Sequence, residues 1–313
     1  MSDNNRLGVF KTYKLYVGGK FPRSESGRVY EVTTKTSAAG TAGKGQWLAN
    51  APQSSRKDAR DAVVAARKAF GGWSGATAYN RGQVLYRVAE MLEGRKEQFV
   101  REVAASEGLS KSKAAAAVDA AIDRWVWYAG WTDKIGQIAG GANPVAGPFF
   151  NLSTPEPTGV VAVLAPQKSS LLGLVSVIAP VIATGNTAVV IASADAPLPA
   201  LSLGEVLATS DVPGGVVNIL SGVTAEIAAP LAAHQDVNAI DLTGADAELA
   251  KKLEIAAADN LKRVLRPQPV DTDGASDSED WLASPGTHRL TAFLETKTVW
   301  HPTGTLGAAG SSY

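Results

Sequence analysis

The chain has 313 residues, 45% of them hydrophobic, and its 30 basic and 30 acidic side chains give a formal net charge of zero. This length is enough to bury the core of one large domain or two modest ones. Because the charges cancel, no overall field attracts nucleic acid or an anionic membrane, and we expect neither as a partner. The chain contains no cysteine, which excludes disulfides, thiolate nucleophiles and cysteine-based zinc sites. Its three histidines are too scattered for a metal motif, so we expect no metal site.

The beginning of the chain predicts a small sheet followed by helices. Residues 14–17 (KLYV) precede Gly18-Gly19, a strand followed by a turn, and residues 29–32 are expected to be the neighbouring strand. The first six residues lead into polar sequence without the apolar run of a signal peptide. The longest apolar stretch, 171–192, is broken by Pro180 and by Gly185-Asn186-Thr187 into a shorter helix and a strand, and does not predict a membrane span. We therefore expect a cytoplasmic protein.

Three helices are predicted in the first 130 residues. Ser55 and Asp58 have the spacing of a capping box, and Gly71-Gly72 is expected to end the helix that they begin. Leu85, Val88 and Leu92 recur at helical spacing, and a third helix is expected over 113–129. Residues 1–130 are therefore expected to form an N-terminal hairpin with helices.

From residue 158 to 266, short β-branched runs alternate with helical sequence. This alternation is typical of βαβ units with a parallel sheet covered on both faces, so the predicted fold class is α/β, with a Rossmann-like sheet. The predicted strands are 160–164, 188–191, 216–220, 239–242 and 263–265. The predicted helices between them are 169–184, 199–209, 225–233 and 247–260.

The last part of the chain changes in character. Residues 267–280, PQPVDTDGASDSED, are acidic and almost without apolar side chains, which indicates a linker. Residues 289–300 alternate apolar and polar side chains, as a strand does, and we assign 281–303 to this strand region. Residues 304–313 are expected to be a flexible tail.

Four segments in order, PTGVVAVLAP, GNTAVV, PGGVVNILSG and HQDVNAIDLTGA, resemble the coenzyme-binding domain of aldehyde dehydrogenases. LYVGGKF and FLETKTVWHP are similar to the first hairpin and the last strand of the same family, so the resemblance covers most of the chain. It implies that residues 131–157 and the strand over 289–300 form a protruding β-arm used for oligomerisation. KLYVGGKFPRSESG is similar to sequence of the sixteenth class, in which a complete module is joined to a degenerate one.

The chain departs from the family at the positions that the resemblance assigns to chemistry. The family has Trp-Asn, whose amide donates to the developing oxyanion, where this chain has Gln167 and Lys168. Loss of one such donor typically lowers the rate about 10² to 10³-fold. The family's lysine and glutamate that bind the adenosine ribose are replaced by Ile191 and Ala194. Each charge-assisted hydrogen bond of this kind contributes roughly 1.5–3 kcal/mol, so coenzyme binding should be weakened.

Two further departures concern the coenzyme phosphates and the catalytic domain. The family's FTGS serine is Ala245 here, and Leu249 stands where a glycine is expected near the following helix, so a pyrophosphate would meet a bulkier wall. After residue 265 the family continues with Glu-Leu-Gly-Gly-Lys and the catalytic domain that carries the nucleophilic cysteine, whereas this chain has the acidic segment. Without a thiol or this glutamate, we expect no catalytic residue and no resident cofactor.

Other conspicuous residues have simpler interpretations. Lys168 is expected to be a solvated lysine at a helix start rather than a repurposed catalytic lysine. His234 is expected to be a cap or surface residue. The aromatic residues at 125–131 are expected to pack in a core or an interface. Glycines at positions 185, 214, 215, 222 and 244 are expected to serve turns rather than to hold phosphate.

The retained arm motivates the principal functional hypothesis. In the family, the arm of one subunit adds a strand to the catalytic-domain sheet of its dimer mate, and this chain offers no such sheet in return. We therefore expect an inactive subunit that joins a full-length aldehyde dehydrogenase in a hetero-oligomer through about 289–300. Two alternatives remain: a residual NAD(P)-binding protein or weak oxidoreductase with a non-thiol site, and an architectural subunit that caps or links enzyme filaments.

Overall fold

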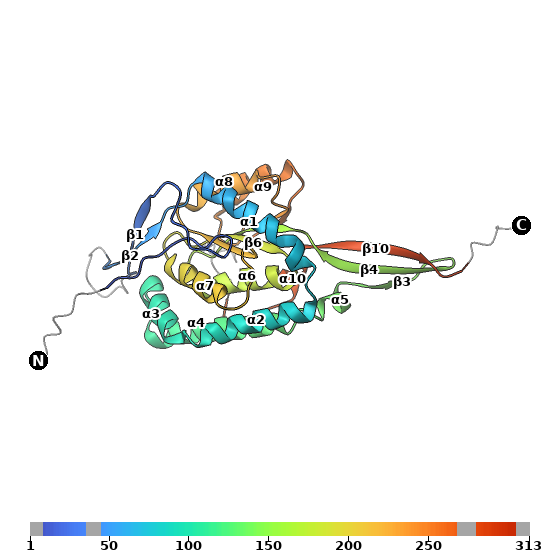
Figure 1. The fold of residues 1–313 in the computed structure, drawn as a ribbon, viewed down its shortest axis with the longest axis horizontal. Helices are drawn as coiled ribbons and strands as arrows, with labels where there is room; N and C mark the ends of the chain where they lie inside the picture. Colours follow the sequence, from blue (N-terminus) through green and yellow to red (C-terminus); the bar gives the residue numbers. More distant parts are fainter. Residues whose placement is uncertain (1–8, 36–44, 268–279, 305–313) are drawn as a thin grey trace, which may run out of the picture.

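The computed structural model describes residues 9–35, 45–267 and 280–304. It shows a layered α/β body from which a long antiparallel arm extends (Figure 1). The predicted acidic linker lies outside the described residues apart from its two end positions, and the predicted tail lies outside them beyond Gly304.

The body is built on a parallel sheet, which confirms the predicted fold class. The strand order is β7-β6-β5-β8-β9, and every neighbouring pair is parallel. The strands are rich in valine and isoleucine, the β-branched residues that favour this conformation. They are β5 (Val160–Leu164), β6 (Thr187–Ile191), β7 (Val217–Leu220), β8 (Ala239–Asp241) and β9 (Arg263–Leu265).

Alternate side chains of the sheet enter two separate hydrophobic cores. Val161 and Val163 of β5 enter one core, while Val160 and Leu164 enter the other. Figure 1 shows α1, α8 and α9 on one face and α6 and α7 on the opposite face, with α2 and α4 outside them. Helices cover both faces, as parallel sheets require. Those that follow the sheet strands are α6 (Leu172–Ala183), α7 (Leu198–Ala208), α8 (Thr224–Ala232) and α9 (Ala247–Ala258).

Helix α6 is the most apolar helix of the body, and all of its residues are buried. Pro180 lies inside it, as the predicted helix over 169–184 implies. None of the helices in the described ranges combines the length and the apolarity needed to cross a bilayer.

Helix α1 (Arg56–Ser74) begins where the sequence predicts. The Ser55 side chain accepts from the Asp58 amide, and the Asp58 carboxylate accepts from the Ser55 amide at 2.7 Å, which is a complete capping box. The predicted end at Gly71-Gly72 is too early, because the helix continues to Ser74. This end of the helix is stabilised by Trp73, which is 2% exposed and donates its indole N–H to the Ile182 carbonyl at 2.9 Å.

Three helices complete the N-terminal region: α2 (Ala78–Glu93), α3 (Lys96–Glu107) and α4 (Lys111–Ala129). The helices predicted near Leu85 and over 113–129 are confirmed by α2 and α4, but the sequence analysis omitted α3. Phe99, Val100 and Val103 of α3 are fully or almost fully buried. The helix ends at Gly108, whose φ of 70° places it in the left-handed region that favours glycine.

The expected pairing of 14–17 with 29–32 is wrong. Strand β1 (Val29–Thr33) pairs instead with β2 (Trp47–Pro52). Tyr16 exchanges backbone hydrogen bonds with Ile219 of β7, and the Gly18-Gly19 turn folds Lys20 back onto Val17. A Cβ on Gly19 would lie 2.9 Å from the Cα of Gly214, so the close packing of this turn on the body requires glycine.

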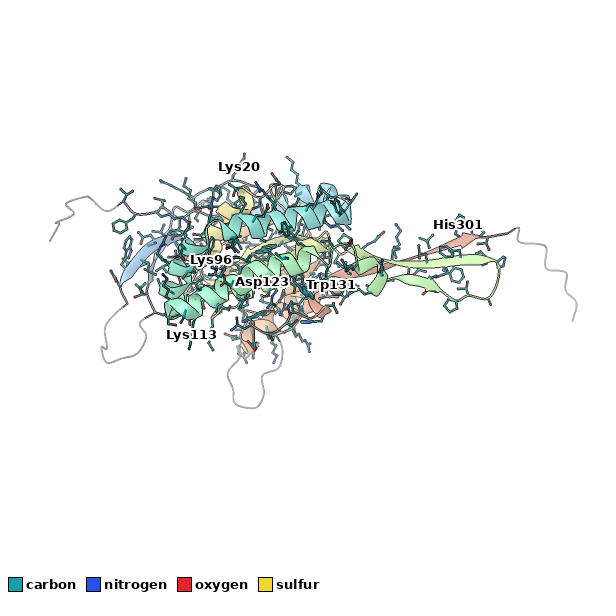
Figure 2. The ribbon with its side chains drawn as sticks, turned by 90° about the horizontal axis from the view of Figure 1, so that it is seen from below. Lys20, Lys96, Lys113, Asp123, Trp131 and His301 are labelled. Carbon is teal, nitrogen blue, oxygen red and sulfur yellow. The ribbon has the colours of Figure 1, made fainter. Side chains whose placement is uncertain are left out.

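The arm is a three-stranded antiparallel sheet in the order β10-β4-β3. Its strands are β3 (Gly141–Asn143), β4 (Phe149–Pro157) and β10 (Leu294–Pro302), and the four-residue helix α5 (Ile135–Ile138) precedes them. Strands β10 and β4 are paired over their whole length, from Leu294 opposite Pro157 to Pro302 opposite Phe149. In Figure 2 Trp131 lies near the root of the arm and His301 lies toward its far end.

The predicted strand over 289–300 begins too early. Residues 288–291 form the short helix α10 (His288–Thr291), and the strand begins at Leu294. Leu290 and Phe293 are both nearly fully buried, and their spacing of three is typical of a helical turn. The apolar residues at 290, 292 and 294 also have the spacing of a strand, so the sequence pattern fits both structures. The Arg289 guanidinium donates to the Asp241 carboxylate at 2.9 Å inside the body, which holds this turn against the sheet.

Candidate functional site

The main candidate site is a cavity of about 600 Å³ beside the carboxyl ends of the parallel strands. It is bounded by the loops after β5, β6, β7 and β8 and by the first turns of α8 and α9. In open α/β sheets this edge is where ligands generally bind. The cavity is lined by Tyr30, Gln53, Gln167, Lys168, Ala194, Gly222, Val223, Thr224, Ala225, Thr243, Gly244, Ala245, Asp246 and Leu249.

The structure brings five of the six predicted family positions together in the wall of this cavity. They are Gln167, Lys168, Ala194, Ala245 and Leu249. The sixth, Ile191, is fully buried in β6 within the core beneath α1, α8 and α9 and does not line the cavity. Five positions separated along the chain therefore belong to one site, and their roles remain predictions.

Gln167 fills the gap between the ends of β5 and β6. Its side-chain oxygen accepts from the Ala194 amide at 3.0 Å, and its side-chain nitrogen donates to the Ala165 carbonyl at 2.8 Å. Ser193 donates its hydroxyl to the Gln167 carbonyl at 2.8 Å. Both polar ends of the Gln167 amide are thus bonded to the protein, so this side chain shapes the wall.

Gly244 is required by close packing, and Gly222 by its backbone conformation. A Cβ on Gly244 would lie 2.0 Å from the Ala165 carbonyl oxygen. Gly222 has a φ of 137°, a conformation that other residues rarely adopt. The geometry at these two positions favours the turn interpretation over a phosphate cradle.

The two helix ends at the cavity differ in their electrostatics. Asp246 caps α9 by accepting from the Leu249 amide at 2.8 Å, which places a carboxylate on the wall. Val223 precedes α8 and offers no side-chain cap, so the amides of that first turn face the cavity edge without one. Lys168 is the only basic residue among the described residues of the lining. Because Asp246 caps α9, a phosphate at the start of that helix would meet a negative charge.

Tyr30 and Gln53 enter the wall from β1 and from the residue after β2. Burial and, to a lesser extent, the nearby Asp195 carboxylate raise the pKa of the Tyr30 hydroxyl, so it stays neutral at physiological pH. Neither residue was predicted from the sequence. Their role depends on packing between β1 and the loops of a distant sheet, for which the local sequence carries no signal.

A buried ion pair lies behind the cavity. Asp241 at the end of β8 and Arg289 on α10 are 0% and 5% exposed, and their side chains are 2.9 Å apart. Arg289 also donates to the Thr243 hydroxyl at 3.1 Å, and Thr243 donates that hydroxyl to Asp241. This pair was not predicted from the sequence, although a carboxylate in the apolar run Ala239-Ile240-Asp241-Leu242 signals a buried partner.

The described lining offers little for covalent chemistry. It holds no histidine, and the chain has no cysteine. The Thr243 hydroxyl is already bonded to Asp241 and Arg289. Among the described residues of the cavity there is thus no hydroxyl or thiol paired with a histidine base, so the geometry suits binding better than nucleophilic catalysis.

The other singled-out residues lie outside the cavity. His234 follows α8, and its ring nitrogen Nδ1 accepts from the Asp236 amide at 3.1 Å within the loop that leads to β8. Trp125 and Tyr128 of α4 are 0% and 1% exposed, and the Trp127 ring contacts those of Tyr128 and Trp131. The aromatic cluster packs in the core as predicted. Within the described ranges, no three potential metal ligands gather.

Comparison with known proteins gives a consistent result. The family model described as "Aldehyde dehydrogenase family" matches residues 31–266. Retinal dehydrogenase 2 of Gallus gallus is 34% identical over 81% of this chain and 48% of its own length. The mitochondrial aldehyde dehydrogenase of Leishmania tarentolae is 32% identical over 80% of this chain and 49% of its own length. This chain thus spans about half the length of these curated relatives.

Solved structures agree. An NAD+ complex of an aldehyde dehydrogenase from Bacillus cereus superposes with a TM-score of 0.75 at 26% identity, covering 81% of this chain and 50% of that one. HpcC from Thermus thermophilus gives a TM-score of 0.75 at 28% identity, covering 81% of this chain and 47% of that one. The sheet, the helices around it and the order of the matched segments therefore place this chain in the aldehyde dehydrogenase family.

Proposed function

We propose that this chain is a non-catalytic subunit that assembles with a full-length aldehyde dehydrogenase through strand β10 of its arm. The observation that carries the proposal is the arm itself. Its outer strand has nine residues, all exposed except Leu294, and within the described part of the chain no strand pairs with its outer side. A long unpaired edge is a template for another chain.

Two features support the absence of catalysis. No side chain of the 313 residues is a thiol, so the covalent intermediate that the family resemblance implies has no nucleophile. The connection from β9 to α10 spans the residues between Leu265 and His288, a stretch far too short to fold as a second domain. The chain keeps the coenzyme-type sheet and the arm but has no room at this point for a catalytic domain.

The root of the arm is firmly held, which suits a docking element. Arg263 of β9 donates two hydrogen bonds to the Glu295 carboxylate, at 2.7 and 2.6 Å. Asn186 donates its side-chain N–H to the Phe293 carbonyl at 3.0 Å in the interior. A strand fixed at its root loses less conformational entropy when a partner binds to it.

Co-expression with a complete family member from the same genome tests this proposal. We expect an affinity tag on this chain to retain the untagged enzyme. Thr298→Pro removes a backbone N–H from the outer side of β10 and should abolish retention, while Thr298→Val keeps that N–H and should preserve it. Retention that is equal for both variants, or absent for the natural chain, would contradict assembly through β10.

A second candidate function is residual NAD(P) binding, and the cavity at the ends of the parallel strands favours it. Its place relative to the sheet is that of a nucleotide site in open α/β folds. A related structure is an NAD+ complex. The wall residues Asp246 and Leu249 weigh against phosphate binding, so any affinity should be low.

Thermal unfolding with NAD and with NADP tests the second candidate. A binder at 100 times its Kd raises the free energy of unfolding by about 2.7 kcal/mol, which appears as a higher Tm. Ala194→Glu places a carboxylate on the cavity wall where the family resemblance has one, and should increase the shift with NAD if the site is a residual coenzyme site. No shift with either protein at millimolar coenzyme would exclude this function.

A further inference from the structure

The hydrogen-bonding directions of β10 follow from its register on β4. In an antiparallel pair, residues alternate between positions bonded to the partner and positions that point away from it. Thr158 donates to the Phe293 carbonyl at one end of the pair, and Thr303 donates to the Pro148 carbonyl at the other. Odd-numbered residues of β10 therefore bond to β4. The N–H and C=O groups of Thr296, Thr298 and Trp300 point to the outer side.

The prolines of the arm agree with this assignment. Thr296 lies opposite Pro155, and Leu294 lies opposite Pro157. A proline has no N–H, so neither pair can exchange two hydrogen bonds. The two prolines also lack a donor toward the β3 side, and β3 has only three residues. One long edge of the arm, the outer side of β10, is therefore equipped for pairing.

The sequence of β10 is compatible with pairing to itself. If an antiparallel copy is centred on Thr298, every residue from Leu294 to Pro302 has a partner in the second copy. Lys297 then faces Val299, and Glu295 faces His301 near the far end of the strand, so no like charges are opposed. A register centred on Lys297 would instead place two lysines directly opposite each other.

Other registers bury less of the strand. Centring the pair on Thr296 would direct the end of the second strand against residues 290–293, where Phe293 is 2% exposed and already packed in the body. Centring it on Trp300 would leave the root half of β10 unpaired. The register centred on Thr298 is the one that covers the whole strand without meeting the body.

Apolar side chains near the far end of the arm support an occupant of this edge. Trp300 and Val299 of β10 are 57% and 45% exposed, and Phe150 of β4 is 48% exposed. In the register centred on Thr298, Trp300 lies beside Thr296 of the second copy, and Val299 lies beside the methylene groups of Lys297. Pairing would remove part of this apolar surface from water.

We propose that the occupant is a second copy of this chain: two β10 strands pair edge to edge about a two-fold axis at Thr298 and join the two arms into one continuous six-stranded sheet. This inference goes beyond the proposed assembly with a complete enzyme and does not depend on it. If both hold, the two partners compete for one edge. A full-length partner in excess would then displace the second copy from β10 by mass action.

Because the chain has no cysteine, a single introduced cysteine can form a disulfide only with its copy in a second chain, and this tests the register directly. On the axis, the two Thr298 residues form a hydrogen-bonded pair with Cα atoms about 5.5 Å apart, within the range of a disulfide. The two Thr296 residues would be about 14 Å apart along the strands, beyond that range. Thr298→Cys should therefore form a disulfide-linked dimer under mild oxidation, while Thr296→Cys alone should not. A mixture of Thr296→Cys and Trp300→Cys chains should form mixed dimers.

The purified chain without any partner provides the second measurement. Light scattering during gel filtration should show a dimer that dissociates on dilution, persists in Thr298→Val and is lost in Thr298→Pro. A monomeric natural chain at high concentration, or cross-linking of Thr296→Cys as fast as that of Thr298→Cys, would overturn the proposal. Neither result bears on retention of a full-length enzyme, which is measured separately.

Discussion

At the scale of single residues, the buried pair of Asp241 and Arg289 connects the end of the parallel sheet to the segment that leads into the arm. Both side chains are almost without solvent contact. Arg289 also lies over the Trp281 ring, 5.5 Å from its centroid, and Arg124 donates to the Trp281 and Ala283 carbonyls. These contacts hold the residues just after position 280 against α4 and α10.

Removing one partner of this pair should be strongly destabilising. Arg289→Met leaves the Asp241 charge buried without its partner, and we expect the free energy of unfolding in urea to fall by about 3–5 kcal/mol. Adding Asp241→Asn removes the charge and keeps an acceptor for the Thr243 amide, so the double variant should recover most of the loss. A double variant as unstable as Arg289→Met would show that the ion pair is not the cause.

Glu102 on α3 introduces a pH dependence. Burial raises the pKa of its carboxyl above 4.5, against the opposing effects of hydrogen bonds from Gln98, Ser202 and Tyr13 and the charge of Lys11. The folded protein then binds this proton more tightly than the unfolded chain, so this group makes stability fall as pH rises above 4.5. Glu102→Gln should make the pH profile of unfolding less steep over this range. Glu97→Gln, an exposed change on the same helix, is the control, and an unchanged profile in Glu102→Gln would contradict the assignment.

At the scale of elements, the sequence predicted those features that depend on residues close together in the chain. Ser55 and Asp58 are three residues apart and bond to each other, so the start of α1 could be predicted. The partner of β1 could not, because the choice between residues 14–17 and β2 depends on how the Gly18-Gly19 turn packs against Gly214. Tyr30 reaches the cavity for the same long-range reason, whereas Gln167 and Leu249 were found from their place in family segments.

The capping box of α1 gives a prediction at this scale. Ser55→Ala removes the acceptor for the Asp58 amide and should lower the free energy of unfolding by about 1 kcal/mol. Ser55→Thr keeps a hydroxyl and should be close to neutral. Denaturant unfolding of the two variants measures the difference, and equal stability of Ser55→Ala and the natural chain would show that the cap contributes nothing measurable.

At the scale of the whole molecule, the chain combines a five-stranded parallel sheet and a three-stranded arm with about half the length of its relatives. The sheet is closed on both faces by helices, and the cavity at its edge lacks a paired nucleophile among the described residues. The outer edge of β10 is exposed from residue 295 to 302, and within the described part of the chain no strand pairs with it.

The most direct test of assembly with a complete enzyme is the mass of the particle formed on co-expression. Native mass spectrometry of the material retained by a tag on this chain should give masses that contain whole numbers of both chains. The same measurement with Thr298→Pro should show only the tagged chain. If the retained material contains this chain alone while the full-length enzyme elutes separately as its own oligomer, the proposed hetero-oligomer is contradicted.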